Sequence, residues 1–143
     1  MSTGFLTLQA ALAAALAPAL AGGAVSINRA RPLPASQATG IALSLQQSTA
    51  QEVVLGMLDW VTSFSVECYA RAATGADPAG AIDALLADVW ARLCAIDSGA
   101  LGAQAVTINP QLDWSVDEAE TPVVCVTLRL SVQHRTPFAT LIA

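Results

Sequence analysis

The beginning of the chain carries apolar side chains at a helical spacing. Large apolar residues recur every three or four positions, with alanine filling most of the other positions: Phe5, Leu8, Leu12, Leu16 and Leu20. This spacing places them on one side of an α-helix. Pro18 is expected to kink or end the helix near Ala17, since a proline ring clashes with the preceding turn. The pattern predicts an alanine-coated helix that can pack closely on a sheet or on a neighbouring subunit.

Beyond the two glycines at 22–23 the pattern changes from helical to alternating. Val25 and Ile27 predict a short first strand. The prolines within 31–34 predict a surface connection, because proline cannot donate to a sheet ladder. Alternation over 41–45 then predicts a second strand.

A long hairpin is expected next. The polar run 46–52 predicts the projecting tip of this hairpin, and 53–55 would begin the returning strand. The third strand alternates over 59–71. Its inward face is predicted to hold Trp60, Thr62, Phe64, Val66, Cys68 and Ala70, and its outward face Asp59, Ser63, Ser65, Glu67 and Arg71.

Asp77 and Pro78 are typical of a helix start, with aspartate as N-cap and proline in the first helical turn. The apolar stripe of this second helix is Ile82, Leu85, Leu86, Val89, Leu93 and Ile96. Asp88 and Arg92 are spaced for a surface ion pair. Gly99 is expected to end the helix.

Two further strands follow. The fourth has apolar residues of one parity, interrupted at Asn109 and Pro110, so it is expected to be bent or broken there: Val106, Ile108, Leu112, Trp114 and Val116. The fifth is predicted to face inward with Val124, Val126, Leu128, Leu130 and Val132, and outward with Cys125, Thr127, Arg129, Ser131 and Gln133.

The expected order is therefore helix, three strands, helix, two strands. It predicts an α+β fold, with an antiparallel or mixed sheet of about five strands and two main helices packed on one face. A length of 143 residues predicts one domain spanning 1–143.

Charge and cysteine content narrow the function classes. The chain has six arginines, no lysine and eleven carboxylates, for a net charge of −5. A dedicated nucleic-acid binder would carry a basic surface, which this composition does not supply. Cys68, Cys94 and Cys125 fit neither a disulfide framework nor zinc spacing, and reduced, buried thiols with a packing role are expected.

The apolar segment 5–25 also contains Ala-x-Ala sequences that look like a signal-peptidase site. A secretory signal usually begins with basic residues, and the segment 1–4 has none. Thr7, Gln9 and Pro18 interrupt any membrane span. A helix is the favoured interpretation; an exported binding domain whose first 22 residues are removed remains an alternative.

No catalytic motif stands out. The chain lacks a nucleophile elbow, a phosphate-binding loop and a dinucleotide fingerprint, so no enzyme, cofactor or metal site is predicted. His134 is expected to be an inward-facing residue at a strand end with an ordinary hydrogen bond. Trp60 has the parity of the core face, with an interface role as the alternative. The acidic cluster around Trp114 fits a solvated turn, a partner surface or, less well, a hard-cation site: Asp113, Asp117, Glu118 and Glu120.

The order and spacing of several segments resemble the tail terminator proteins of long-tailed bacteriophages, the family of minor tail protein U of phage lambda. The resemblance runs roughly over 5–136, and no single motif is diagnostic. Its segments are the alanine-rich helix, Arg31 and Pro32 before 41–45, the strand 64–71, the helix 82–90, the acidic segment 117–122 and the final strand 126–135.

The resemblance implies an α/β sandwich-like fold and a structural virion protein. Such proteins form a homohexameric ring that caps the tail tube at its set length, at the head-proximal end of the tail, after assembly in the bacterial cytoplasm. Implied partners are further copies of the chain, the tail tube protein and a head-completion or neck protein. DNA would pass through the lumen without specific binding, which suits an acidic, lysine-free chain.

Local reasoning, and not the resemblance, suggests the contact residues. The candidates for subunit or partner contacts are Arg31, Pro32, Gln46, Gln47, Gln51, Glu52, Val53, Trp60, Trp114, Asp117, Glu118 and Glu120. Another tail or neck component, such as a head-tail joining protein, remains an alternative within phage assembly.

Overall fold

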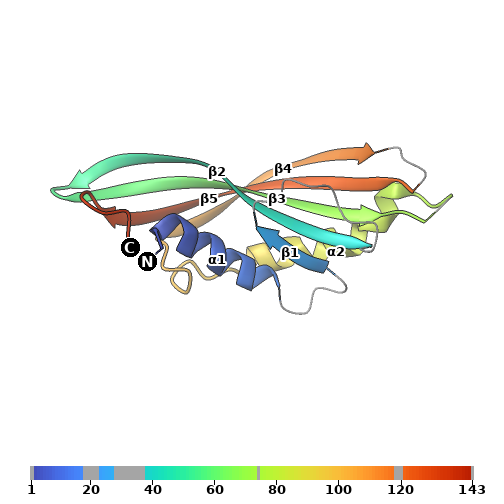
Figure 1. Cartoon of the computed structure of the whole chain (residues 1–143), viewed down its shortest axis with the longest axis horizontal. Coiled ribbons are helices and arrows are strands. Elements are labelled where there is room, and N and C mark those ends of the chain that lie inside the picture. Colours follow the sequence, from blue (N-terminus) through green and yellow to red (C-terminus); the bar gives the residue numbers. More distant parts are fainter. Residues whose placement is uncertain (1, 18–22, 28–37, 74, 118–120, 143) are drawn as a thin grey trace.

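The computed structural model describes residues 2–17, 23–27, 38–73, 75–117 and 121–142 (Figure 1). Its elements are α1 (Gly4–Leu16), β1 (Gly23–Ile27), β2 (Thr39–Val54), β3 (Met57–Arg71), α2 (Pro78–Cys94), β4 (Ala105–Asp117) and β5 (Val123–Pro137). The strands form one sheet in the order β1-β2-β3-β5-β4. β1 runs parallel to β2 and the other neighbours are antiparallel. This arrangement confirms the predicted α+β class and element order.

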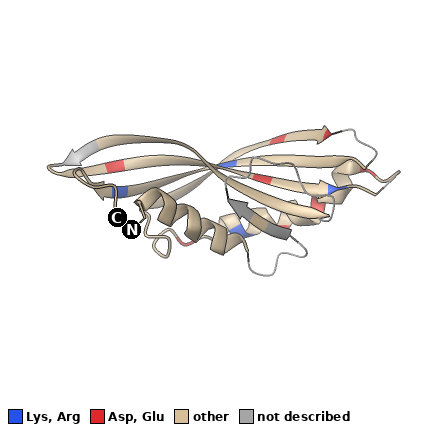
Figure 2. Ribbon diagram, viewed as in Figure 1, with Lys and Arg blue, Asp and Glu red and all other residues tan. Residues whose placement is uncertain are grey.

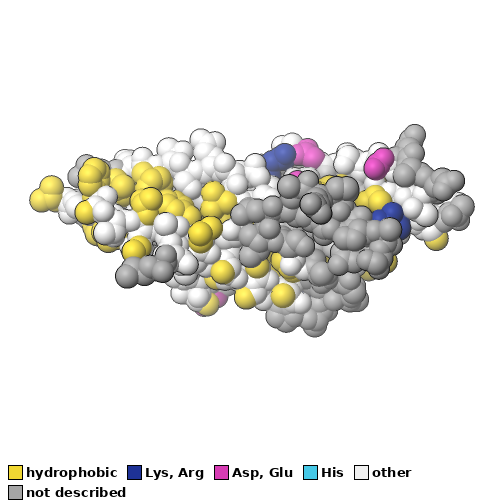
Figure 3. All heavy atoms as spheres, in the orientation of Figure 1, with side chains coloured by type: hydrophobic (Ala, Val, Ile, Leu, Met, Phe, Trp, Pro, Cys, Tyr) yellow, Lys and Arg dark blue, Asp and Glu magenta, His cyan; other side chains and the backbone are white. Residues whose placement is uncertain are grey.

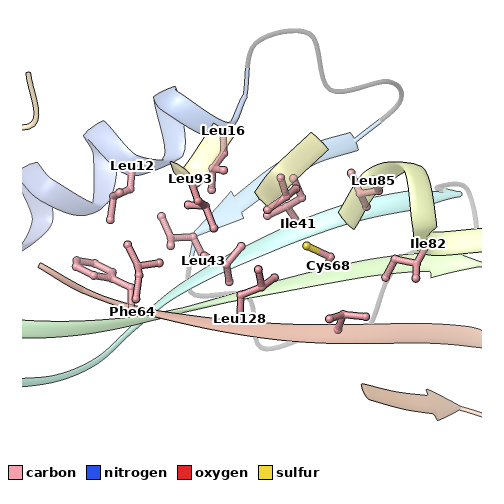
Figure 4. Packing of buried hydrophobic residues seen from close by; sticks show 14 of the residues in the cluster. Leu12, Leu16, Ile41, Leu43, Phe64, Cys68, Ile82, Leu85, Leu93 and Leu128 are labelled. Atoms are coloured by element: carbon pink, nitrogen blue, oxygen red, sulfur yellow. The ribbon is translucent and has the colours of Figure 1, made fainter. Parts of the chain in front are cut away.

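Both helices pack on one face of the sheet, and the core lies between the two layers (Figure 4). Leu8, Leu12 and Leu16 of α1 are buried, as the helical spacing predicted; Leu20 lies outside the described residues. The inward residues of β3 from Thr62 to Ala70 and those of β5 are buried too, which confirms both alternations.

The helix starts follow the capping signals. The Asp77 side chain accepts a hydrogen bond from the Ala79 amide at 3.1 Å, and Pro78 begins α2. The first helix ends at Leu16 with Ala17 as C-cap, so the predicted end before Pro18 is confirmed. In α2, the predicted pair forms between Arg92 Nε and Asp88 Oδ1 at 3.2 Å.

The second helix stops earlier than predicted, at Cys94 instead of near Gly99. Asp97 Oδ1 accepts a hydrogen bond from the Gly99 amide at 3.0 Å. This local bond offers the backbone an alternative to further helical turns. Ile96 therefore lies beyond the helix, although it still packs against the core. Cys94, predicted as a packing residue, is exposed.

The position of the hairpin turn also differs from the prediction. The segment 46–52 is part of β2, and the two residues Leu55 and Gly56 make the turn. Gly56 has φ 81°, a conformation that glycine adopts without steric cost. A β-bulge at Gln46 shifts the alternation of side chains by one residue. Ser48 therefore points to the helix-covered face of the sheet, opposite Thr62. The polar run looked like a loop because the helices cover little of this half of the sheet.

β4 bends without breaking. Its register with β5 shifts between Asn109 and Asp113, around Pro110, as the sequence pattern indicated. Proline is tolerated there because β4 is an edge strand and Pro110 has no paired residue on β5.

Candidate subunit interface

The turn between β2 and β3 forms one end of an elongated molecule, and large apolar side chains are exposed there (Figures 1 and 3). Leu55, in the turn itself, is 97% exposed. The C-terminal segment returns to the same end, because the Phe138 amide donates to Gly56 O at 2.7 Å and the Gly4 amide donates to Leu141 O at 2.7 Å. We call this surface the apolar end; it consists of Leu6, Leu55, Phe138, Leu141 and Ile142.

A second apolar surface lies between α2 and the edge strand β4. A groove of about 390 Å³ opens there, with Leu86, Trp90 and Leu112 among its walls. Further along β4, Trp114 and Val116 oppose the buried Val126 and Val124 and therefore face the helix side. They lie at the open edge and are 51% and 46% exposed. We call this surface the α2–β4 groove; it is lined by Asp83, Leu86, Ala87, Trp90 and Leu112, and Trp114 and Val116 lie beyond it along β4. Leu86, predicted in the core stripe, is only half-buried here.

Between these two surfaces, a polar cluster lies beneath the start of α1. The Trp60 indole donates to Thr136 Oγ1 at 2.9 Å, and Thr62 Oγ1 lies 2.7 Å from His134 Nε2. The Phe5 ring meets both Trp60 and His134 edge to face, with centroids 4.9 Å and 5.1 Å apart. Trp60 is thus mainly an interior residue that joins α1 to the sheet.

His134 is 2% exposed, which confirms its inward direction. Burial lowers the pKa of its imidazole, because the charged form loses its hydration. Nδ1 has no hydrogen-bond partner among the described residues. Thr62 and Phe5, which contact the ring, are both uncharged and do not offset the cost of protonation.

The structure places the predicted contact residues on different surfaces. Gln46, Gln47 and Gln51 are exposed along β2, and Trp114 and Asp117 are exposed on β4. Glu52 and Val53 lie in β2 just before the turn, while their side chains are not described. Arg31, Pro32, Glu118 and Glu120 lie outside the described residues.

The acidic cluster is only partly described. Asp113 forms an ion pair with Arg129 and accepts a hydrogen bond from Gln111 Nε2 at 3.1 Å. The Arg129 hydrogen bond lowers the pKa of the Asp113 carboxyl. Within the described parts of the chain, no group of three histidine, cysteine or acidic side chains lies close enough to hold a metal ion. Cys68 is buried, which raises the pKa of its thiol to about 12.

The pattern of apolar and polar residues did not predict the apolar end or most of the α2–β4 groove. Leu55 could have been found as a large apolar residue directly before a glycine, a combination that places a side chain at a turn. Leu86 and Leu112 were expected on the core face because their spacing matches it. Their exposure depends on how far α2 reaches across the sheet, which parity does not reveal.

No protein-family model matches the chain, and a search of curated proteins found no match either. Among the described residues, none of the helices has the length and apolar character needed to cross a membrane.

Proposed function

We propose that this chain is a structural subunit of a phage tail, a tail terminator that assembles into a ring and caps the tail tube. The observation that carries the proposal is the pair of exposed apolar surfaces, the apolar end and the α2–β4 groove, at different places on one chain. A ring is built from contacts in which one surface of a subunit meets a different surface of the next. Exposed apolar patches often mark sites of contact with another protein.

The fold agrees with what the resemblance implies. Helices pack on one face of a mixed sheet, and among the described elements none covers the opposite face. Both sheet edges, β1 and β4, lack a strand partner within the described chain, so each is open to another subunit. These features support a role as an assembly protein.

The pairing of arginines with aspartates supports a ring through which DNA passes without being bound. The described arginines at 92, 129 and 135 each pair with an aspartate, namely Asp88, Asp113 and Asp59. Two of these pairs lie on the helix-free face of the sheet, where acidic and basic positions stand near each other (Figure 2). Neutralised guanidinium groups attract phosphates weakly, so this face suits a lumen that DNA must slide through.

The proposal is tested by asking whether the chain binds to the ends of tail tubes and stops their growth. Tail tube protein of the same phage is polymerised with and without the purified chain, and tube growth is followed by light scattering and electron microscopy. The proposal predicts that the chain binds at tube ends and stops elongation. Tubes that elongate equally in its presence, with no chain in the sedimented fraction, would contradict it.

A head-tail joining protein would behave differently. It would bind finished tails or the neck but leave the growth of bare tubes unchanged. The same assay, with finished tails as the second sample, separates the two roles.

A further inference from the structure

The beginning of α1 is attached to the sheet through a cluster of aromatic and hydroxyl side chains. Phe5 is the contribution of α1, and its ring contacts both Trp60 of β3 and His134 of β5. These two strands are paired without interruption from Met57 to Arg71, so the sheet side of the cluster is held in place. We call it the His134 cluster; it consists of Phe5, Ser48, Trp60, Thr62, His134 and Thr136.

We propose that α1 is a pH-sensitive cover: protonation of His134 favours release of the beginning of α1 from the sheet. The imidazolium form has two N–H donors, and Thr62 Oγ1, which lies 2.7 Å from Nε2, satisfies one of them. Nδ1 is buried and has no hydrogen-bond partner among the described residues. A charged ring therefore needs water, and water gains access most readily when Phe5 moves away, because the other contacts belong to paired strands.

Among the described side chains, those that face the cluster carry no charge. Neither residues 4–16 of α1 nor the segment 138–142 includes a charged side chain. On the covered face of β3 the titratable side chain is Cys68, and burial raises the pKa of its thiol to about 12, so it stays neutral. The covered faces of β4 and β5 add no acidic or basic residue besides His134. The chain ends, 1 and 143, lie outside the described residues.

The charged residues closest to the cluster lie at other positions. Asp59 and Arg135 pair with each other on the helix-free face of the sheet. Arg92 and Asp97 line a groove beside the later turns of α1. Glu52 lies on β2 at a register position on the face of the cluster, and its side chain is not described, so Glu52→Gln is one of the variants tested.

At neutral pH the covered state is favoured, because Leu8, Leu12 and Leu16 of α1 are buried in the core (Figure 4). Burial lowers the pKa of His134, so the covered state binds a proton less tightly than a released state in which the ring meets water. Mild acid therefore shifts the equilibrium toward release. This release concerns a single chain, so it goes beyond the proposed function and holds whether or not the chain forms a ring.

The first test follows the ring of His134, which NMR observes directly because the chain has one histidine. We expect its pKa to lie below the ordinary value of about 6.5. Phe5→Ala should raise the pKa of His134 toward 6.5, because water then reaches the imidazole. Leu6→Ala is the matched control in the same helical turn; Leu6 is 50% exposed, and the pKa should stay unchanged. Glu52→Gln should leave it unchanged too.

Two results of this titration would overturn the cover. The first is a pKa of His134 that is unchanged or lowered in Phe5→Ala. A lowered value would mean that the phenyl ring stabilises the imidazolium instead of excluding water. The second is a lowered pKa in Glu52→Gln, which would mean that a carboxylate compensates the charge of the ring.

The second test is hydrogen exchange of the full chain at pH 7.5 and 5.5, corrected for the intrinsic rate at each pH. Protection of the α1 amides should fall several-fold and at most about tenfold, whereas protection of the α2 amides should change much less. His134→Gln should remove the fall in α1. The ring titration and the wild-type exchange need no such variant, so a poorly folded His134→Gln leaves both tests intact.

Unchanged protection of α1 in the wild-type chain would contradict the release. An equal fall in α1 and α2 would mean that protonation destabilises the whole fold, and a fall that persists in folded His134→Gln would mean that another group titrates. Each of these results overturns the proposal. None of them affects the tube assay, which judges the proposed function separately.

Discussion

The backbone amide of Phe138 donates a hydrogen bond of 2.7 Å to the carbonyl oxygen of Gly56, 82 positions earlier in the chain. This bond joins the segment after β5 to the turn between β2 and β3. The turn and the C-terminal segment thereby form one surface, with Leu55 and Phe138 both exposed on it. Whatever shifts the turn should therefore change both the stability of the chain and its association.

Gly56→Ala should lower the free energy of unfolding by about 1 kcal/mol. Its φ of 81° lies in the left-handed region, where a Cβ atom is unfavourable even though space around it is open. Gly80→Ala is the control, for which we expect a change in the free energy of unfolding of opposite sign. Gly80 lies in α2 with room for a Cβ, so alanine should stabilise the chain by about 0.5 to 1 kcal/mol. Urea unfolding measures both, and equal effects would contradict the turn geometry.

Two leucines of α1 should differ sharply in their contribution to stability. Leu12 is fully buried, so Leu12→Ala should cost about 2 to 5 kcal/mol through lost burial and the cavity left behind. Leu6 is 50% exposed, and Leu6→Ala should change stability by about 0.5 kcal/mol or less. Chemical denaturation at low protein concentration, where association is minimal, compares them. Similar losses would show that α1 packs by a different face.

Stability should fall as the pH drops below about 6.5, and His134 should account for the slope. Burial lowers the pKa of His134 in the folded chain, so the unfolded chain binds the proton more tightly. The free energy of unfolding then decreases as pH falls from the unfolded pKa toward the folded one. Asp59 and Asp113, which pair with arginines, have lowered pKa values, so they affect stability only at more acid pH.

His134→Gln removes the titrating group and keeps a polar side chain beside Thr62. Its free energy of unfolding should change less between pH 7 and about pH 5.5 than that of wild type. Equilibrium unfolding at several pH values measures the difference. Parallel pH curves for the two proteins would mean that His134 does not titrate differently on folding.

The pattern of apolar and polar residues correctly predicted the elements that have one buried face and one solvent-exposed face. Phe64 and Val66 of β3 follow such a pattern, as does the cap of α2 at Asp77. The remaining features depend on contacts between residues that are distant in the sequence. The turn at Leu55 and Gly56 was missed because both faces of that hairpin half carry polar residues, so alternation gave no signal there.

The candidate surface was predicted only in part. Trp114 was selected and is indeed half-exposed, while Trp60 was assigned between core and interface and lies beneath α1. Leu86 was assigned to the core because its helical spacing is correct. Its partial exposure follows from the position of α2 relative to the edge strand, which is a tertiary property.

The central claim is that this chain builds a ring, and the most direct measurement is the mass of the assembled particle. Light scattering over a concentration series, with negative-stain images of the peak fraction, should give a species of about six times the 14.6 kDa of one chain and rings with a central hole. A chain that remains a monomer at every concentration, and also after incubation with assembled tail tubes, would contradict the account.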